Sequence, residues 1–328
     1  MGYNCGMIEK TYTGLVIKAI SGFFTVVPDA GQGLDAPAVC QLPGRLKQQW
    51  HTSTIVAVGD RVTISLLPGE PGVGVIESVA ERKAALSRTR PSARSRKLDS
   101  DQEQVLVANP DQVVFVFAMK TPAPNRRKLD RFLVVAEQND LPAVICINKI
   151  DLTGIDKARE LFDLYTDIDY PVLYTSTKTG AGVDDLRELL RGKISVLAGS
   201  SGVGKSSLLN AVQPGLGLKV REVSQATGKG LHTTRYAELV PLAIGGYVAD
   251  TPGIRGLALY DLEPYEVDAY FREIAPLVAE CRFSDCTHRH EPGCVVRTAV
   301  ERGDVSPHRY DSYLRLREEH EILDDKLY

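Results

Sequence analysis

The segment from Gly199 to Ser206 carries the residue types that are needed to bind a polyphosphate. Its sequence, Gly-Ser-Ser-Gly-Val-Gly-Lys-Ser, fits the pattern GxxxxGK followed by Ser or Thr. Glycines let backbone N–H groups close around phosphate oxygens, Lys205 offsets their negative charge, and the Ser206 hydroxyl can ligate Mg²⁺. An apolar run before the loop and the helix-like sequence SSLLNAV after it predict a strand and a helix on its two sides. The expected phosphate-site residues are Gly199, Ser200, Ser201, Gly202, Val203, Gly204, Lys205, Ser206 and Ser207.

A second motif, Asn148-Lys149-Ile150-Asp151, indicates which base the nucleotide carries. It follows an apolar run, so we expect it at the C-terminal end of a strand, where Asp151 can accept from guanine N1–H and the 2-amino group. Adenine would leave that buried carboxylate unpaired, and such a mismatch can discriminate by about 10⁴-fold. Asn148 is expected to brace the loops around the base, and the stem of Lys149 is expected to lie over the base plane. The motif therefore favours guanine.

Two shorter elements resemble parts of known GTPases. Ser176, Thr177 and Lys178 follow an apolar run and resemble the SAK loop, in which a backbone N–H contacts guanine O6. Asp250-Thr251-Pro252-Gly253 resembles the DxxG element, in which Asp250 would hold Mg²⁺ through a water and the Gly253 N–H would contact the γ-phosphate. Together with the first two motifs, they predict a complete GTP site.

The order of these motifs is inverted relative to ordinary GTPases. The NKxD motif and the SAK-like loop come first, followed by the phosphate loop, Thr233-Thr234 and DxxG. The sheet can stay the same because such sites lie at strand ends and do not depend on chain order. The sequence therefore predicts a circular permutation.

Three cysteines and a histidine form a cluster near the C-terminal end of the chain. Cys281, Cys286, His288 and Cys294 supply three thiolates and one imidazole, the ligand set of a closed, structural zinc site. His290 is a rival fourth ligand, and three reduced thiols without metal are the simpler alternative. We expect one zinc ion that stabilises the local fold and takes no part in chemistry.

The composition is that of an ordinary globular protein with several domains. The 328 residues are 43% hydrophobic and 25% charged, with a formal net charge of -3, so any nucleic-acid contact must be local. No apolar run of about 18 residues occurs, and the N-terminus lacks a signal-peptide pattern. We expect a cytoplasmic protein that does not contact a membrane and is a monomer.

Residues 10–80 predict a small β-barrel. Short β-prone runs separated by Gly, Pro and Asp favour an oligonucleotide-binding (OB) fold, although an SH3-like barrel would give nearly the same pattern. The expected strands are residues 14–20, 23–27, 38–42, 54–58, 61–67 and 73–79. Residues 82–97 carry seven Lys and Arg and no acid. They are either a solvated connector or an arm that contacts a nucleic-acid backbone.

The centre of the chain predicts an α/β sheet, and the end predicts helices. Apolar runs at residues 113–119, 142–148, 171–177 and 193–199 alternate with helical stretches, which indicates a mostly parallel sheet. Residues 237–244 and 247–250 are expected to form a hairpin through Gly245-Gly246. The last 70 residues, for example 307–327, are expected to be helical. We therefore divide the chain into an OB-like barrel (1–81), a basic linker (82–103), a permuted GTPase domain (104–258) and a zinc-binding helical domain (259–328).

The motif order, the barrel in front of it and the Cys/His cluster behind it together resemble the circularly permuted GTPases of ribosome assembly. The stretches GSSGVGKSSLLN, GKGLHTTR and DTPG are specific to that family. The resemblance implies a late maturation factor that binds the small ribosomal subunit and its rRNA, hydrolyses GTP to GDP when the subunit stimulates it, and then leaves. The spacing of the Cys/His cluster also matches the zinc element of the family.

His232 is the candidate catalytic residue. Position 254 is Ile, where Ras-type GTPases place a water-orienting Gln, so the attacking water must be positioned otherwise. The resemblance implies a role in hydrolysis for the His of the HTT motif, which is His232 here; the alternative is a loop histidine without chemistry. Thr234 is expected to ligate Mg²⁺ and contact the γ-phosphate, with Thr233 as its competitor.

Two other functions are compatible with parts of the sequence. The chain could act mainly as an RNA-binding docking factor in which GTP is an occupancy switch, or it could be an ATP-dependent kinase in which the NKxD motif is a coincidence. Competition between GTP and ATP separates the kinase from the others. A hydrolysis-dead variant that still supports maturation would favour docking.

Overall fold

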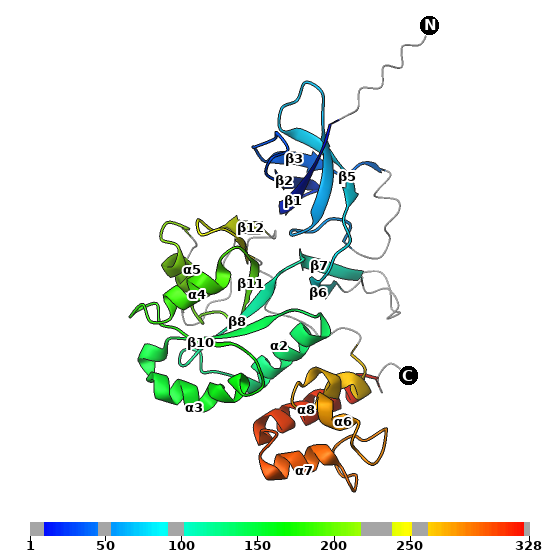
Figure 1. The fold of residues 1–328 in the computed structure, drawn as a ribbon, viewed down its shortest axis with the longest axis vertical. Coiled ribbons are helices and arrows are strands. Elements are labelled where there is room, and N and C mark those ends of the chain that lie inside the picture. Colours follow the sequence, from blue (N-terminus) through cyan, green and yellow to red (C-terminus); the bar gives the residue numbers. More distant parts are fainter. Residues whose placement is uncertain (1–9, 45–53, 91–101, 218–237, 251–261, 325–328) are drawn as a thin grey trace, which may run out of the picture. The chain divides into compact units, whose positions relative to one another are not determined.

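A computed structural model describes residues 10–44, 54–90, 102–217, 238–250 and 262–324 (Figure 1). The chain divides into two compact units. Unit 1 contains Met1–Asp111, Leu190–Val196 and Ala226–Gly256, and unit 2 contains Gln112–Leu189, Leu197–Gln225 and Leu257–Tyr328. Each unit draws on separate parts of the chain.

Five strands of unit 1 form a closed barrel. The strands are β1 (Thr11–Ile20), β2 (Phe23–Pro28), β3 (Ala38–Gln41), β4 (Arg61–Leu66) and β5 (Val73–Val79). Their order is β1-β2-β3-β5-β4, and β4 pairs back onto β1; β3 and β5 run parallel and the other pairs antiparallel. Alternate side chains, including Val26, Cys40, Ile64 and Ile76, fill the interior. The predicted OB-like barrel is confirmed.

The strand expected at residues 54–58 is wrong, because this segment is irregular and leads into a turn at Val58 and Gly59. Its apolar residues are buried as a strand's would be, but the backbone is held by Asp60, whose carboxylate accepts from the Ala57 N–H at 2.7 Å. Arg82 pairs with the same carboxylate at 2.8 Å. Gly59 follows with φ +93°, and a Cβ there would lie 2.0 Å from the carbonyl oxygen of Ala108. The apolar pattern reflects packing around this turn.

Both ends of the basic segment, residues 82–103, form β-strands. Strands β6 (Ala85–Arg90) and β7 (Gln102–Ala108) form a two-stranded antiparallel sheet at its two ends. Arg82, the first basic residue, binds the buried carboxylate of Asp60. The ends of the segment are therefore built into unit 1.

The predicted hairpin near the DxxG element is confirmed. Strands β12 (Glu238–Pro241) and β13 (Tyr247–Asp250) are antiparallel, and β13 runs parallel to β11 (Ile194–Ala198). Gly246 has φ +85°, and a Cβ there would lie 2.5 Å from the backbone nitrogen of Lys193, so the turn needs glycine. The first three residues of β11 belong to unit 1, and its last two, which lead into the phosphate loop, belong to unit 2.

Unit 2 contains the parallel strands that carry the nucleotide motifs. Strand β9 (Ala143–Asn148) lies between β8 (Gln112–Ala118) and β10 (Val172–Tyr174), and both pairs are parallel. All residues of β8 and β9 are buried, which explains their continuous apolar sequence. The accompanying helices are α2 (Arg126–Gln138), α3 (Ile155–Thr166), α4 (Val183–Leu190) and α5 (Lys205–Val212). A short 3₁₀ turn, η2 (Ile150–Leu152), follows β9.

The C-terminal part of unit 2 is helical, as expected. It contains the 3₁₀ segment η4 (Pro264–Tyr270), α6 (Ala275–Val278), α7 (Val295–Arg302) and α8 (Pro307–Asp324). Phe271, Ile274, Val296 and Tyr313 form its core, together with two of the clustered cysteines. Among the helices that the structure describes, none has the length and apolar content of a membrane span.

Candidate nucleotide site and metal cluster

Asn148 holds three loops together at the end of β9. Its side chain is buried, and Nδ2 donates to the carbonyl oxygen of Val203 in the phosphate loop at 2.9 Å. The Thr175 hydroxyl donates to Asn148 Oδ1 at 3.3 Å from the end of β10. The NKxD motif, the residue before the SAK-like loop and the phosphate loop thus meet at one amide side chain.

Lys149 directly precedes the short turn η2 after β9, and Asp151 lies within it. Lys149 adopts φ +62°, and its Nζ donates to the carbonyl oxygens of Gly202 at 2.6 Å and Thr121 at 2.5 Å. Burial lowers the pKa of Lys149, although Asp151 opposes this shift. The Asp151 carboxylate is exposed and accepts from the buried Ser176 hydroxyl at 2.6 Å. One carboxylate is therefore positioned by a hydrogen bond and still open to a ligand.

The remaining SAK-like residues are on the surface. Thr177 and Lys178 are exposed, whereas Ser176 is fully buried and its N–H donates to the Ala181 carbonyl oxygen at 2.9 Å. The loop is therefore fixed through Ser176.

The phosphate loop connects β11 with α5 and needs glycine at two positions. Gly199 has φ +152°, and a Cβ there would lie 2.2 Å from the Val116 carbonyl oxygen. Gly204 has φ +100°, and a Cβ there would lie 2.4 Å from Asn148 Nδ2. Any other residue at 204 would push the asparagine out of place. The motif's glycines are therefore required by close contacts as well as by backbone conformation.

Two lysines contact the first half of this loop. Lys205, the first residue of α5, donates through Nζ to the carbonyl oxygens of Gly199 at 2.7 Å and Ser200 at 3.1 Å. Lys128 of α2 donates to the Ser200 hydroxyl at 3.1 Å. Lys128 belongs to no recognisable motif, so sequence reasoning missed it. Ser201 is exposed, while Ser206 and Ser207 are half-buried in the first turn of α5.

The switch residues are only partly covered by the structure. His232, Thr233, Thr234 and Gly253 lie outside the described residues. Asp250 is the last residue of β13, at the C-terminal end of a strand parallel to β11. Its role as the aspartate of a DxxG element stays a prediction.

The four expected metal ligands come together in the helical part of unit 2. One ligand atom from each of Cys281, Cys286, His288 and Cys294 lies within 4.8 Å of the others. His288 Nδ1 is 3.6 Å from Cys281 Sγ and 3.3 Å from Cys294 Sγ. Burial raises the pKa of Cys286 to about 12, so its thiol keeps its proton unless a cation displaces it. Three sulfurs and one nitrogen this close together fit a tetrahedral zinc ion.

The structure distinguishes His288 from its rival. His288 is fully buried, and its Nε2 is 3.4 Å from Asp268 Oδ2, so a carboxylate orients the ring from behind. His290 is exposed and outside the cluster; its backbone N–H donates to Glu291 Oε2 at 3.0 Å. Glu291 also accepts from the Thr287 N–H at 2.8 Å, and it thereby fixes the loop that contains His288.

The NKxD motif and the phosphate loop stand at strand ends in inverted chain order, and this arrangement defines a circularly permuted GTPase. A family profile described as RsgA GTPase matches residues 79–260. The small ribosomal subunit biogenesis GTPase RsgA of Gemmatimonas aurantiaca is 45% identical over 307 residues, covering 94% of this chain and 97% of the relative. The chain therefore belongs to the RsgA GTPase family, and the resemblance drawn from its motifs is confirmed.

Two solved structures agree with this assignment. YjeQ from Thermotoga maritima superposes with a TM-score of 0.74 at 38% identity, covering 94% of this chain and 98% of that one. YloQ, described as a circularly permuted GTPase, gives a TM-score of 0.72 at 32% identity, covering 95% of each chain. The permuted fold is thus shared over nearly the whole length.

Proposed function

We propose that this GTPase is a late maturation factor of the small ribosomal subunit, which binds the subunit and its rRNA and hydrolyses GTP when the subunit stimulates it. The Gemmatimonas aurantiaca relative is, by its name, a small ribosomal subunit biogenesis GTPase. The observation that carries the nucleotide part of the proposal is the hydrogen bond from Asn148 to the Val203 carbonyl oxygen, because it joins the NKxD motif and the phosphate loop in one site.

In this site, each motif has a separate task. Asp151 pairs with guanine, Asn148 and Ser176 hold the loops in place, and Lys149 covers the base. The N–H groups of the phosphate loop and Lys205 hold the phosphates. The exposure of Asp151 and its single 2.6 Å hydrogen bond from Ser176 support its assignment as the base reader.

Magnesium and the attacking water belong to the other half of the site. Ser206 and Thr234 would ligate Mg²⁺, Asp250 would support it through a water, and Gly253 would contact the γ-phosphate. His232 would act in hydrolysis, since Ile254 cannot orient a water. Loose phosphoryl transfer depends mainly on positioning, so slow turnover accelerated by a partner is the expected behaviour.

One zinc ion would be held by Cys281, Cys286, His288 and Cys294. With four protein ligands there is no open coordination position, so the metal would connect α6, α7 and the loop between them without acting in chemistry. Zinc analysis of the purified protein should give one ion per chain, and Cys286→Ser should lower both zinc content and stability. Fully folded, metal-free wild type would contradict this role.

The RNA-facing surface would consist of the barrel (1–81), the basic segment (82–103) and the zinc-binding helical domain (259–328), which flank the permuted GTPase domain (104–258). We expect the protein to work in the cytoplasm as a monomer, away from membranes. Arg82 is engaged with Asp60, so the remaining basic residues of the segment would make any backbone contacts.

The test is GTP turnover by the purified protein with and without stoichiometric small ribosomal subunits, at two salt concentrations. Subunits should raise turnover, and the increase should fall at high salt because Lys and Arg contacts to phosphates release counterions. His232→Ala should slow the stimulated reaction while leaving GTP affinity nearly unchanged. If small subunits did not raise the rate of GTP turnover, the proposed coupling would be refuted. A hydrolysis-dead variant that still supports maturation would favour a docking factor.

A further inference from the structure

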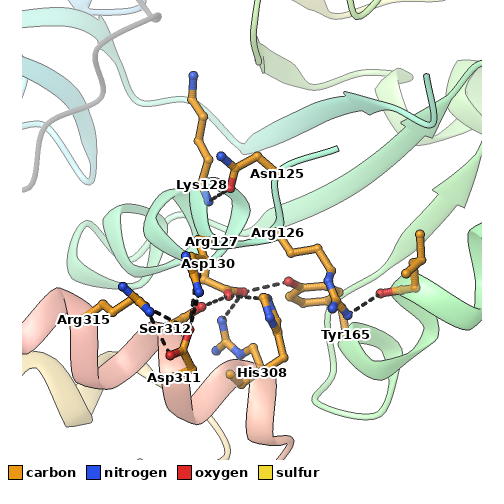
Figure 2. A network of polar contacts seen from close by, with 12 residues as sticks. Asn125, Arg126, Arg127, Lys128, Asp130, Tyr165, His308, Asp311, Ser312 and Arg315 are labelled. Atoms are coloured by element: carbon orange, nitrogen blue, oxygen red, sulfur yellow. Dashed lines mark hydrogen bonds and ion pairs between the residues drawn. The ribbon is translucent and has the colours of Figure 1, made fainter. Parts of the chain in front are cut away.

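Lys128 is a cation at the phosphate loop that belongs to none of the GTPase motifs. It lies in the first turn of α2, and its Nζ is 3.1 Å from Ser200 Oγ and 5.3 Å from the centre of the Phe132 ring. Figure 2 shows the side chain extending from α2 on the side away from α8. Its half-buried stem therefore carries the ammonium group to the loop.

The second half of the phosphate loop is held by the motif that reads the base. Asn148 Nδ2 donates to the Val203 carbonyl oxygen at 2.9 Å, and Lys149 Nζ donates to that of Gly202 at 2.6 Å. Contacts at residues 202 and 203 thus mark the end of the loop nearest to the guanine.

The first half of the loop is where the cations gather. Lys205, the lysine that reaches the β- and γ-phosphates in such loops, rests on the carbonyl oxygens of Gly199 and Ser200. Lys128 contacts the same Ser200 through its hydroxyl. The two ammonium groups therefore converge on the end of the loop that serves the terminal phosphates.

The partner of Lys128 is a poor match for its charge. Among the ion pairs of the described residues, none includes Lys128, and its hydrogen-bond acceptor is a neutral hydroxyl. A charge-assisted bond to an anion is roughly twice as strong as a bond between neutral groups. Because two cations converge on one neutral residue, a polyphosphate is the ligand that would gain most from them.

The backbone of Lys128 is also firmly placed. The Asn125 side chain caps α2 by accepting from the Lys128 N–H at 3.0 Å. Two residues further along, Asp130 fixes the same helix to α8 through Arg309, at 2.9 Å. Such anchoring reduces the entropy that the lysine would lose on binding a phosphate.

We propose that Lys128 contacts the γ-phosphate and lets the protein distinguish GTP from GDP. This inference rests on the proposed function, in that it assumes that residues 199–206 hold the nucleotide's phosphates. GDP lacks the phosphate that Lys128 would meet, so the lysine would contribute to binding of the triphosphate alone.

The experiment measures the dissociation constants of GDP and of a non-hydrolysable GTP analogue, both with Mg²⁺. Lys128→Met keeps an unbranched side chain and removes the charge. It should weaken the analogue about tenfold, the size of one charge-assisted contact, and change GDP by less than about twofold. Lys128→Arg, which keeps the positive charge, should retain most of the wild-type affinity for the GTP analogue. Arg131→Met is the matched control, because Arg131 lies on the same helix but pairs with Glu319 on α8, and it should change neither constant.

Equal weakening of both nucleotides by Lys128→Met, or no change in either, would overturn the inference. Lys205→Ala in the same assay tests the underlying assignment, because that lysine should serve the β-phosphate as well. It should weaken both nucleotides. If Lys205→Ala left both unchanged, the proposed phosphate site itself would fail, whereas a normal Lys205→Ala result with a silent Lys128→Met would reject Lys128 alone.

Discussion

Two regions of unit 2 differ in how their charged side chains are paired. One is the contact between helices α2 and α8, and the other is the set of nucleotide loops at residues 148–151 and 199–205. Asp130 of α2 is completely buried and accepts from Tyr165 at 2.8 Å and from Arg309 at 2.9 Å, while Ser312 also donates to it. Arg309 is equally buried, and its Nε donates to Glu273 Oε1 at 2.6 Å. Figure 2 shows Asp130 facing Ser312, Tyr165 and His308. The Asp130 cluster is the name used below for Asp130, Tyr165, Glu273, His308, Arg309 and Ser312.

In the nucleotide loops, charged groups contact neutral hydrogen-bond partners. Asp151 is exposed and is held by one hydroxyl, and Lys149 donates to the neutral carbonyl oxygens of Gly202 and Thr121. Lys205 likewise donates to backbone carbonyl oxygens. Asp151 and Lys149 are therefore positioned by neutral hydrogen-bond partners.

The difference separates charges that hold the fold from charges that serve a ligand. In the Asp130 cluster, buried charges of opposite sign pair with one another. Removing one of them leaves its partner buried without a counter-charge, which lowers the stability of the fold. In the loops, neutral partners give way to a nucleotide at little cost. Substitutions in the first region should therefore change stability, and substitutions in the second should change binding.

The largest effect is expected from Asp130→Ala. The change leaves the buried Arg309 with Glu273 as its remaining carboxylate, and it leaves the hydroxyl groups of Tyr165 and Ser312 without their acceptor. The free energy of unfolding should fall by roughly 3 kcal/mol, as is usual when one partner of a buried pair is lost. Urea denaturation measures this. Asp311→Ala is the control, because Asp311 pairs with Arg127 at the surface of the same helix pair and should cost less than about 1 kcal/mol.

The same cluster predicts a pH dependence. Burial alone would raise the pKa of Asp130, but His308, Arg309 and Ser312 outweigh it and lower the pKa below its usual value. His308 Nε2 is 3.1 Å from Asp130 Oδ2. A lowered pKa gives stability that is complete above the ordinary value of about 4 and lost as the pH falls through the native value.

The stability difference between wild type and Asp130→Asn should therefore stay constant through the weakly acidic range and shrink below about pH 4. Urea denaturation at several pH values gives both curves. A difference that vanished already near neutral pH would mean that Asp130 is not the charged acceptor of the cluster.

A smaller loss of stability is expected from Gly204→Ala in the phosphate loop. Position 204 has φ +100°, and the added methyl would lie 2.4 Å from Asn148 Nδ2. Backbone strain costs on the order of 1–3 kcal/mol, and displacement of Asn148 should also weaken nucleotide binding. Gly215→Ala is the matched control, because φ there is +90° but nothing lies within 4 Å of the new methyl. Gly215→Ala should lose stability through backbone strain but keep its nucleotide affinity. If both variants lost nucleotide affinity equally, the proposed contact between position 204 and Asn148 would be contradicted.

Much of the fold follows from local sequence patterns. The buried strands β8 and β9 are continuous apolar runs, and the hairpin of β12 and β13 follows from its two glycines. Residues 54–58 misled the prediction because their burial serves a turn that the distant Arg82 and Ala108 help to hold. Periodicity reports which residues are buried, but it does not report which partner holds the backbone.

The site follows from sequence only where a motif has fixed spacing. The cysteine and histidine ligands lie within 14 positions, and the structure brings them together as expected. Asp130 and Arg309 are 179 positions apart, and Lys128 and Ser200 are 72 apart, so no local spacing could pair them. The choice of His288 over His290 needed burial and the carboxylate of Asp268. Contacts that depend on how helices pack had to come from the structure.

The smallest change in stability is expected from Asp151→Asn, which should instead exchange one ligand for another. Asp151 is exposed, and an asparagine can still accept from the Ser176 hydroxyl, so urea denaturation should show a change below about 0.5 kcal/mol. The amide no longer accepts from both guanine N1–H and the 2-amino group, but its NH₂ can donate to the 2-carbonyl of xanthine. GTP affinity should fall by at least about 100-fold, and xanthosine triphosphate should bind better than GTP. Ser176→Ala is the control, since it removes the hydrogen bond that positions the carboxylate while keeping the base preference. Unchanged GTP binding by Asp151→Asn would place the base elsewhere, and a large loss of stability would mean that Asp151 belongs with the structural charges of the Asp130 cluster.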